Sequence, residues 1–294
     1  MNDFSAETYS PDHLGGSFKR YVVENAMPQI LEQLKRGLDE LSCAYIDYCL
    51  ESALQFPDLR HRHLFAGNRA LDHWYPDWLV ADVTKNVALN PPCFGHGLSI
   101  LPETVLQSIR NTIFLDLGAY DGWSVYEMEK FHPRMVHSFD ISIQNKALYQ
   151  KTSEQFRYPF HHHLLALSDR RGEMEFFDNG TSGTNVYHWE RNARVETMTL
   201  DEFANVTLNQ QRIGFIKMDI EGSEMSAIRG GLNTIARDRP VLSVSVYHNP
   251  KDFFEIKPLL ESLDVGYQFL IRKLSICEEY TPFLDTILLA YPEA

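Results

Sequence analysis

The sequence predicts an α/β fold in which a mostly parallel sheet carries helices on both faces and follows a helical N-terminal extension. From Asn111 onward, short apolar runs alternate with segments of helix-forming composition, a rhythm typical of a parallel sheet. Before that point, apolar residues recur at helical spacing. The chain of 294 residues is long enough for one large α/β domain and such an extension. We therefore expect a helical extension over residues 1–110 and an α/β domain over residues 111–294.

The composition is that of an ordinary soluble globular protein, with 44% apolar and 23% charged residues. A net charge of −13 argues against a nucleic-acid-binding surface, which needs a basic face. The N-terminal sequence lacks the basic and apolar regions of a signal peptide. No apolar run approaches the roughly 20 residues of a membrane helix. We expect a cytoplasmic protein with no membrane span and no nucleic-acid partner.

Neither the cysteines nor the histidine run indicates a metal site. The cysteines include no C-x-x-C pair and lack zinc-site spacing. Successive side chains of a strand alternate between faces, so His161, His162 and His163 are not expected to converge on one metal or to be catalytic. Two cysteines fall in a helical pattern and are most simply buried thiols. The four are Cys43, Cys49, Cys93 and Cys277, of which the first two are the helical pair.

The extension is expected to contain two amphipathic helices, Phe18–Leu34 and Leu38–Leu54, packed as a hairpin. The extension is expected to serve either in homo-oligomerisation through these helices or as a lid over the substrate. The segment Asp58–Val83 is rich in histidine, arginine and tryptophan. It is either a surface that faces substrate or another subunit, or aromatic packing onto the main domain. A further short helix is expected at Leu101–Ile109, with Pro102 at its start.

The α/β domain is expected to follow with strands that end near polar residues and helices between them. Strands are expected at Thr112–Leu117, Met135–Phe139, His161–Leu167, Glu173–Phe177 as an inserted hairpin strand, Val195–Thr199, Ile213–Met218, Val241–Val246, Tyr267–Ile271 and Thr286–Ala290. Helices are expected at Ser124–Lys130, Ser142–Phe156, Ser223–Arg229 and Lys251–Ser262, and after Thr199, which forms a capping box with Glu202.

The segment Ile113–Gly122, IFLDLGAYDG, is a buried strand followed by a glycine turn and a helix. This is where an open parallel sheet presents a ligand crevice. The pattern D-x-G-x-x-x-G differs from the dinucleotide fingerprint and from the P-loop. The Asp116 carboxylate would repel a pyrophosphate but could accept hydrogen bonds from a cationic amino-acid ligand, which favours S-adenosylmethionine. The alternative is an ordinary tight turn, with Gly118 and Gly122 supplying unusual dihedrals.

Several strands of this domain end in polar residues that should meet at one edge of the sheet. They are Asp116, Asp140, Ser168 with Asp169, and Asp219. Asp140 follows the first acid at close to the roughly 20-residue offset at which an acid meets a ribose hydroxyl. The alternative for Asp140 is a helix N-cap, and for Asp169 a turn residue. Together, acids that end successive strands indicate a binding edge.

The second signature is the segment Lys217–Glu224, KMDIEGSE. Lys217 and Asp219 point to one side of a strand, and Glu221 continues that side if the chain stays extended. The functional interpretation is a polar cluster that positions and deprotonates a hydroxyl. The alternative is an ion pair of Lys217 with Asp219 or Glu221 that fixes the loop.

His248 follows the strand Val241–Val246 in the sequence SVSVYHNP. An imidazole, with an ordinary pKa near 6.5, suits a general base near neutral pH. The alternative is a structural histidine.

These pieces resemble the FkbM-like family of S-adenosylmethionine-dependent O-methyltransferases. The matching stretches are LDLGAYDG, SFD, ALSD with the following Gly172, TMTLDEF, IGFIKMDIEGSEMSAIRGG and SVSVYHN, and the resemblance runs from about Thr112 to the C-terminus. It implies a Rossmann-like class I methyltransferase fold with a mostly parallel seven-stranded sheet and an antiparallel final strand. It also implies that the cofactor binds to Asp116, Gly118, Ala119, Gly122 and Asp140, and that Ser168 and Asp169 lie near its adenine. Members typically methylate hydroxyls of sugars or polyketide-type natural products. One departure is Asp140 followed by Ile141-Ser142, where the family more often has Glu in a FEP-like sequence.

The sequence thus predicts methyl transfer from S-adenosylmethionine to a hydroxyl of a sugar, glycan or natural product by SN2 displacement. The expected base is His248 or Asp219, and Lys217 and Glu221 are expected to orient the acceptor or the methionine end of the cofactor. A divalent metal on Asp219, Glu221 or Glu224, and His248 is an option that the donor types allow, although no metal is expected. The alternatives are a binding or scaffold protein that keeps the fold without catalysis, and a nucleotide-sugar oxidoreductase or epimerase.

Overall fold

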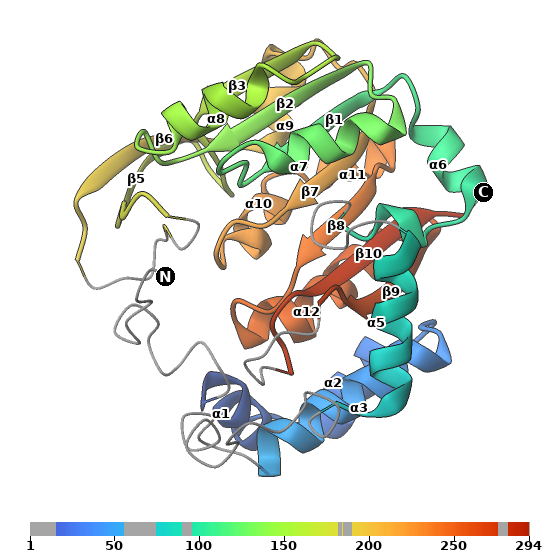
Figure 1. The fold of residues 1–294 in the computed structure, drawn as a ribbon. Helices are drawn as coiled ribbons and strands as arrows, with labels where there is room; N and C mark the ends of the chain where they lie inside the picture. The colour runs from blue at the N-terminus through green and yellow to red at the C-terminus, as the bar shows by residue number, and fades with distance from the viewer. Residues whose placement is uncertain are drawn as a thin grey trace, which may run out of the picture.

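The centre of the molecule is a seven-stranded sheet with the strand order β3-β2-β1-β7-β8-β10-β9 (Figure 1). The computed structural model describes residues 16–55, 75–89, 96–181, 184, 190–275 and 282–293. The strands are β3 (Phe160–Leu164), β2 (Met135–Asp140), β1 (Ile113–Leu117), β7 (Ile213–Met218), β8 (Val241–Ser245), β10 (Thr286–Pro292) and β9 (Tyr267–Lys273). β10 runs antiparallel to both neighbours, and the other pairs of this sheet are parallel. The predicted mostly parallel sheet with an antiparallel final strand is confirmed.

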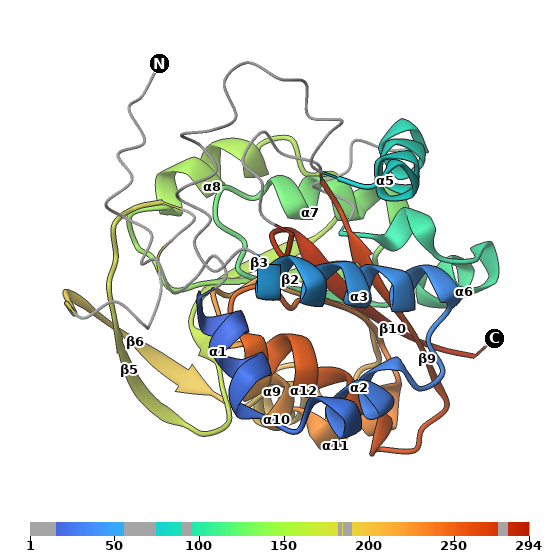
Figure 2. The same ribbon diagram turned by 90° about the horizontal axis from the view of Figure 1, so that it is seen from below.

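Helices cover both faces of this sheet, as Figure 2 shows. Phe114 and Phe215 point into one apolar cluster, and their chain neighbours Leu115 and Ile216 point into the other. The first cluster includes residues of α6 (Glu103–Ile109), α7 (Trp123–Met128) and α8 (Lys146–Ser153). The second includes residues of α9 (Leu200–Val206), α10 (Glu224–Arg229), α11 (Leu232–Asp238) and α12 (Pro250–Glu261). β1, β7 and β8 are consequently buried at every position, as their apolar runs predict.

The N-terminal helices pack on the sheet domain and share its apolar core. They are α1 (Gly16–Glu24), α2 (Met27–Lys35) and α3 (Glu40–Gln55). Phe18 is fully buried and stacks on Phe283 with ring centroids 3.8 Å apart. Tyr21 stacks on Phe254 of α12, and the α3 side of the contact is fixed by an ion pair between Arg272 of β9 and Asp39. α1 contacts both α3 and α12, α2 contacts α12, and α3 contacts β9. The N-terminal helices therefore pack on the sheet domain as well as on each other.

Several expected elements differ in length or number from those observed. The helix expected at Phe18–Leu34 is divided into α1 and α2, because Pro28 lies in the first turn of α2. α8 begins only at Lys146, since Ser142 N–H donates to the Asp140 carboxylate in a turn. α11 was not expected, because Gly230-Gly231 reads as the end of a helix and another begins at once. α5 (Asp77–Leu89) begins within the segment Asp58–Val83, for which no helix is predicted, and continues beyond it.

Some sequence-based expectations lie outside the described residues. These are His61, Arg62, His63 and Trp74 of the segment Asp58–Val83, together with Cys93 and Cys277. In the described part, Cys49 is buried and Cys43 half-buried, and both are free thiols. None of the described helices has the length and apolar character needed to cross a membrane.

The strand expected at His161–Leu167 is split between two sheets. β3 pairs with β2 in the main sheet, whereas β4 (Ala166–Leu167) pairs with β6 (Ala193–Met198) in a three-stranded sheet. β5 (Gly172–Phe176) pairs antiparallel with β6, which confirms the inserted hairpin. The predicted cap after β6 is also present, since Thr199 accepts from Glu202 N–H.

Histidines from β2 and β3 gather on one face at this edge of the main sheet. His137 Nδ1 lies 2.9 Å from His163 Nε2, and the His161 ring lies 5.1 Å from the His137 ring. His161 and His163 share a face because they are two residues apart, while His162 points to the other face and stacks on Tyr149. Burial, with the neighbouring His163 and His161, lowers the pKa of His137 to about 4.

This histidine contact predicts a pH-dependent stability. A folded pKa below the unfolded value of about 6.5 contributes stability that is present above that pH and is lost as the pH falls toward 4. The difference in Tm between the wild type and His137→Asn should therefore be largest near neutral pH and narrow on acidification. The matched control is His132→Asn at an exposed position with a φ of +56°, which asparagine tolerates. A gap that stays constant from neutral pH to about pH 5 would contradict the assignment.

Candidate functional site

The carboxyl ends of β1 and β7 are joined by a buried ion pair. Asp116 and Lys217 are register partners in the sheet. Lys217 Nζ lies 3.0 Å from Asp116 Oδ1 and donates to the Gly118 carbonyl oxygen at 2.5 Å. Ser124 Oγ donates to the other Asp116 oxygen. Burial alone would lower the pKa of Lys217, but Asp116 and Asp219 raise it above its usual value, so the ammonium stays charged.

This pairing changes the expected roles of both residues. The sequence left Asp219 or Glu221 as the partner of Lys217, and the structure shows that the partner is Asp116. The side chains of Asp116 and Lys217 are 0% and 3% exposed, so the ion pair is buried beneath the loops that follow β1 and β7. Asp116 and Lys217 contact each other, and the direct ligand contacts expected of them stay predictions.

The glycine turn after β1 packs directly on the loop after β7. Gly118 has φ +85°, and a Cβ built on it would lie 1.9 Å from the Asp219 carbonyl oxygen. Gly122 has φ +83° and precedes the first residue of α7. Ala119 is 2% exposed and belongs to the apolar cluster beneath α7, so only its backbone can face a ligand. The turn is held to β2 by Gly118 and Ala119 N–H groups, which both donate to the Phe139 carbonyl.

Asp140 ends β2 and faces the same glycine turn. One of its oxygens accepts from Tyr120 N–H at 2.8 Å and the other from Ser142 N–H at 2.7 Å. The alternative role as a helix N-cap is excluded, because the residue before α8 is Asn145. The structure therefore brings Asp140 to the turn that carries Gly118 and Gly122.

Ser168 and Asp169 follow β4, which belongs to the three-stranded sheet. Ser168 N–H donates to Met198 in the three-stranded sheet, and a Cβ on Gly230 would lie 1.9 Å from the Ser168 carbonyl oxygen. The hydrogen bonds and ion pairs of Ser168 and Asp169 within the described chain do not reach Asp140 or the acids after β7. Their expected position near an adenine stays a prediction.

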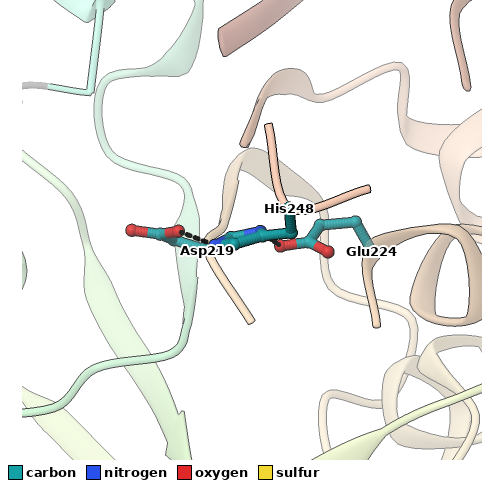
Figure 3. A group of neighbouring side chains, drawn as sticks. All are labelled: Asp219, Glu224 and His248. Carbon is teal, nitrogen blue, oxygen red and sulfur yellow. Dashed lines mark ion pairs between the residues drawn. The ribbon is translucent and has the colours of Figure 1, made fainter. Parts of the chain in front are cut away.

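His248 lies between acidic side chains from two directions, as Figure 3 shows for Asp219 and Glu224. His248 Nε2 is 3.6 Å from Asp219 Oδ1 and 3.7 Å from Glu221 Oε2. On the other side of the ring, Nδ1 is 2.9 Å from Glu224 Oε1, an ion pair by distance whose angle is not that of a hydrogen bond. Burial alone would lower the pKa of His248, but Glu224, Glu221 and Asp219 raise it to about 10. The imidazole is thus a cation at neutral pH.

Glu221 reaches this cluster through a sharp turn of the backbone. The chain does not stay extended after β7, because Glu221 has φ +54° and Gly222 φ +94°. A positive φ is unusual for glutamate, and such conformations gather at functional sites. Burial raises the pKa of Glu221 to about 7, although His248 acts in the opposite direction. For Asp219, burial would raise the pKa, but Lys217 and His248 hold it below its usual value.

The same acids were the candidate metal ligands. Asp219, Glu224 and His248 each offer a donor atom within 4.8 Å of the others. However, Asp219 and Glu224 face opposite nitrogens of the His248 ring (Figure 3). Because a metal needs donors that converge on one point, these residues fit a chain of ion pairs better than a metal centre.

A small cavity of about 50 Å³ adjoins Asp219 on the side of β8 and β10. Its polar lining comes from Asp219 and from residues that the sequence did not single out. The latter are His96, Ser245, Tyr247 and Asp285, with Leu274 and Ile287 as the apolar wall. Tyr247 OH donates to Asp219 Oδ1 at 3.4 Å. Burial and the nearby Lys217 lower the pKa of His96 to about 3, so its imidazole is neutral.

The missed residues had no clear signal in the sequence. His96 lies in a connector far from the α/β segment, and Asp285 precedes the last strand within a turn with φ +55°. Tyr247 adjoins His248 in the chain, and position next to a candidate base is the one cue that could have found it.

The contact between Gly118 and Asp219 predicts that Gly118→Ala is strongly destabilising. The added Cβ has no space and the φ of +85° is strained for alanine. Gly37→Ala is the matched control, because Gly37 has φ +69° and an added Cβ meets no atom within 4 Å. The control should cost only left-handed strain, about 1–2 kcal/mol, and Gly118→Ala clearly more. Equal unfolding free energies for the two variants in denaturant would contradict the close packing.

The buried ion pair predicts a strong loss from Lys217→Met. Removing one partner leaves the Asp116 charge alone in the core, which typically costs about 3–5 kcal/mol. Adding Asp116→Asn should recover part of that loss, because the uncompensated charge is gone. Arg194→Met, in an exposed pair with Glu175, should cost less than about 1 kcal/mol. A small effect of Lys217→Met on chemical unfolding would show that the pair is not structural.

Comparisons with known proteins place this edge in a family context. The sequence model described as Methyltransferase FkbM domain matches residues 116–269, just over half of the chain. The crystal structure of methyltransferase FkbM from Methylobacillus flagellatus KT is similar, with a TM-score of 0.61 and 19% identity. The match covers 94% of this chain but 61% of that one, so this chain spans less than two thirds of its length. At that identity the likeness shows the fold alone.

Other solved structures match more weakly. An rRNA methylase from Streptococcus thermophilus has a TM-score of 0.39 and 11% identity, over 65% of this chain and 93% of that one. TrmK from M. capricolum, solved with S-adenosyl-homocysteine, has a TM-score of 0.32 and 14% identity, over 65% and 69% of the two chains. Neither carries an argument at that score. A search of curated proteins finds no match. The matched domain, together with the strand order and the glycine turn, shows that the chain belongs to the FkbM methyltransferase family.

Proposed function

We propose that this chain transfers a methyl group from S-adenosylmethionine to a hydroxyl of a sugar, glycan or natural product. The observation that carries the proposal is the acidic edge itself. A glycine turn, Asp140 and the cluster around His248 follow neighbouring strands β1, β2, β7 and β8 at their carboxyl ends. In open parallel sheets this edge is where ligands bind.

The residues fit the cofactor in charge and shape. The turn around Gly118 presents backbone without a Cβ, and Asp140 at the end of β2 is placed to accept from ribose hydroxyls. Asp219 keeps its charge beside this turn and suits a cationic ligand. When bound, S-adenosylmethionine supplies an electrophilic methyl on a sulfonium. The protein then has to align the acceptor hydroxyl and remove its proton.

Glu221 is the group best suited to take that proton. Its pKa of about 7 lies close to the working pH, where general-base catalysis is most efficient. His248 was an expected base, but with a pKa of about 10 it is already protonated at neutral pH. In the proposal, the His248 cation instead holds the carboxylates of Asp219 and Glu221 in place. Lys217 acts through the turn that it fixes at Gly118.

The cavity of about 50 Å³ beside Asp219 is proposed to hold one polar group of the acceptor next to the reacting hydroxyl. Carboxylate oxygens of Asp219 and Asp285 can accept from hydroxyls, and the neutral His96 can donate to or accept from them. Because two acids and no cation line the cavity among the described residues, a neutral hydroxyl-bearing group fits it better than an anionic one. The homo-oligomer through the N-terminal helices and the cytoplasmic location stay predictions.

The proposal predicts cofactor binding and a base-dependent transfer step. Calorimetry should show that S-adenosylmethionine and S-adenosylhomocysteine both bind. Radiolabelled-methyl transfer into glycan and metabolite pools, followed by mass spectrometry, should identify the acceptor. Glu221→Gln should lower kcat about 10²–10⁴-fold, the range for loss of a general base, while S-adenosylhomocysteine affinity changes little.

Glu173→Gln, at an exposed position of β5, is the matched control and should keep wild-type kcat. Binding of both cofactor forms without transfer to any pool would favour the scaffold alternative. If neither form binds, the proposal is wrong. Full turnover in Glu221→Gln would remove Glu221 from the role of base and leave the cofactor assignment intact.

A further inference from the structure

Asp252, in the first turn of α12, is a buried acid that the proposed chemistry does not use. It is 1% exposed. Its backbone N–H donates to Asn249 Oδ1 at 3.0 Å, and Asn249 Nδ2 donates to its Oδ2. This reciprocal contact caps α12 but occupies only one of the two carboxyl oxygens. Asp252 Oδ1 is buried without a hydrogen-bond partner among the described residues.

Glu224, at the start of α10, has a matching vacancy. Its side chain is 0% exposed, and Oε1 accepts from Ile220 N–H at 2.9 Å and lies 2.9 Å from His248 Nδ1. Glu224 Oε2 is also buried without a donor among the described residues. The Asp252 carboxyl lies within hydrogen-bonding reach of Glu224. Two buried carboxyls thus meet, and none of the described residues donates an N–H or O–H group to their free oxygens.

Such a pair cannot hold two negative charges at little cost, because like charges in a low dielectric repel strongly. One shared proton removes the repulsion and satisfies both free oxygens. Glu224 Oε1 already accepts from Ile220 N–H and faces the His248 cation, so Asp252 is the member that carries the shared proton. Three groups face Asp252: Glu224, which belongs to α10, His248, which belongs to the loop after β8, and the amide of Asn249, the N-cap of α12. Burial and Glu224 raise the pKa of Asp252 to about 8, which His248 only partly offsets.

We propose that Asp252 is a positioning residue that carries a proton at neutral pH and donates it as a hydrogen bond to Glu224 Oε2. Glu224 is then held with Oε1 against His248 Nδ1. Through His248, the same contact orients Asp219 and Glu221 on the far side of the ring. This last link rests on the proposed function, whereas the proton on Asp252 does not. Loss of that proton places two repelling carboxylates behind His248.

The sign of the effect on stability follows from the direction of the shift. A folded pKa above the unfolded value gives stability that is complete below about pH 4 and is lost as the pH rises through about 8. Asp252→Asn keeps a donor toward Glu224 and an acceptor toward Asn249 at every pH. The Tm difference, Asp252→Asn minus wild type, should therefore increase between about pH 5 and pH 8 and level off above that. Asp252→Ala lacks both groups and should have a lower Tm than Asp252→Asn throughout.

Asp77→Asn in α5 is the matched control, because Asp77 is also an acid in the first turn of a helix but is exposed. Its Tm difference from the wild type should stay constant over that range. Carbon-13 NMR of labelled aspartate gives a second readout that needs no cofactor or acceptor. A carboxyl resonance that disappears in Asp252→Asn should titrate near pH 8. A midpoint below about pH 5, or a Tm difference that does not change with pH, would overturn the proposal. Neither result depends on whether methyl transfer is found.

Discussion

The ion pair between Lys217 and Asp116 is the interaction on which the functional edge depends. It connects the carboxyl ends of β1 and β7, and the same ammonium donates a hydrogen bond to the Gly118 carbonyl oxygen. Gly118 in turn packs against the Asp219 backbone. One buried cation therefore sets the positions of the glycine turn after β1 and of Asp219 after β7. A buried pair of this kind is weak evidence for net stability, but it specifies one arrangement of two loops strongly.

The acidic side chains at this edge are paired with two cations. Lys217 pairs with Asp116, while His248 Nε2 faces Asp219 and Glu221, and His248 Nδ1 faces Glu224. Each carboxylate thus has a cation within reach without either cation entering the cavity beside Asp219. This arrangement explains why the pKa values of two acids on the same loop, Asp219 and Glu221, shift in opposite directions. The lower pKa belongs to the acid that also feels Lys217 most, and the higher one to the acid that is mainly desolvated.

Much of the fold could be predicted because it depends on local composition. The apolar runs of β1, β7 and β8 require burial on both faces, and acids after such runs must meet at one edge. Partners across the sheet could not be predicted in the same way. The alternation of Lys217 and Asp219 along β7 gives the side to which they point, but not that β1 supplies Asp116 opposite Lys217. The turn at Glu221 depends on a positive φ, which the presence of a glutamate in the sequence does not predict. Asp252 reads in the sequence as an ordinary first-turn acid, and only the packing of α10 on α12 makes it unusual.

The docking of the first helices onto the last strands orders the events of synthesis. Asp39 and its partner Arg272 are 233 residues apart, and Phe18 stacks on Phe283. At a translation rate of about 5–20 residues per second, such a separation corresponds to roughly 10–50 s. During that interval the apolar faces of α1 and α3 have left the ribosome while α12, β9 and β10 are still unmade. These apolar faces therefore stay without their native partners until the final residues of the chain emerge.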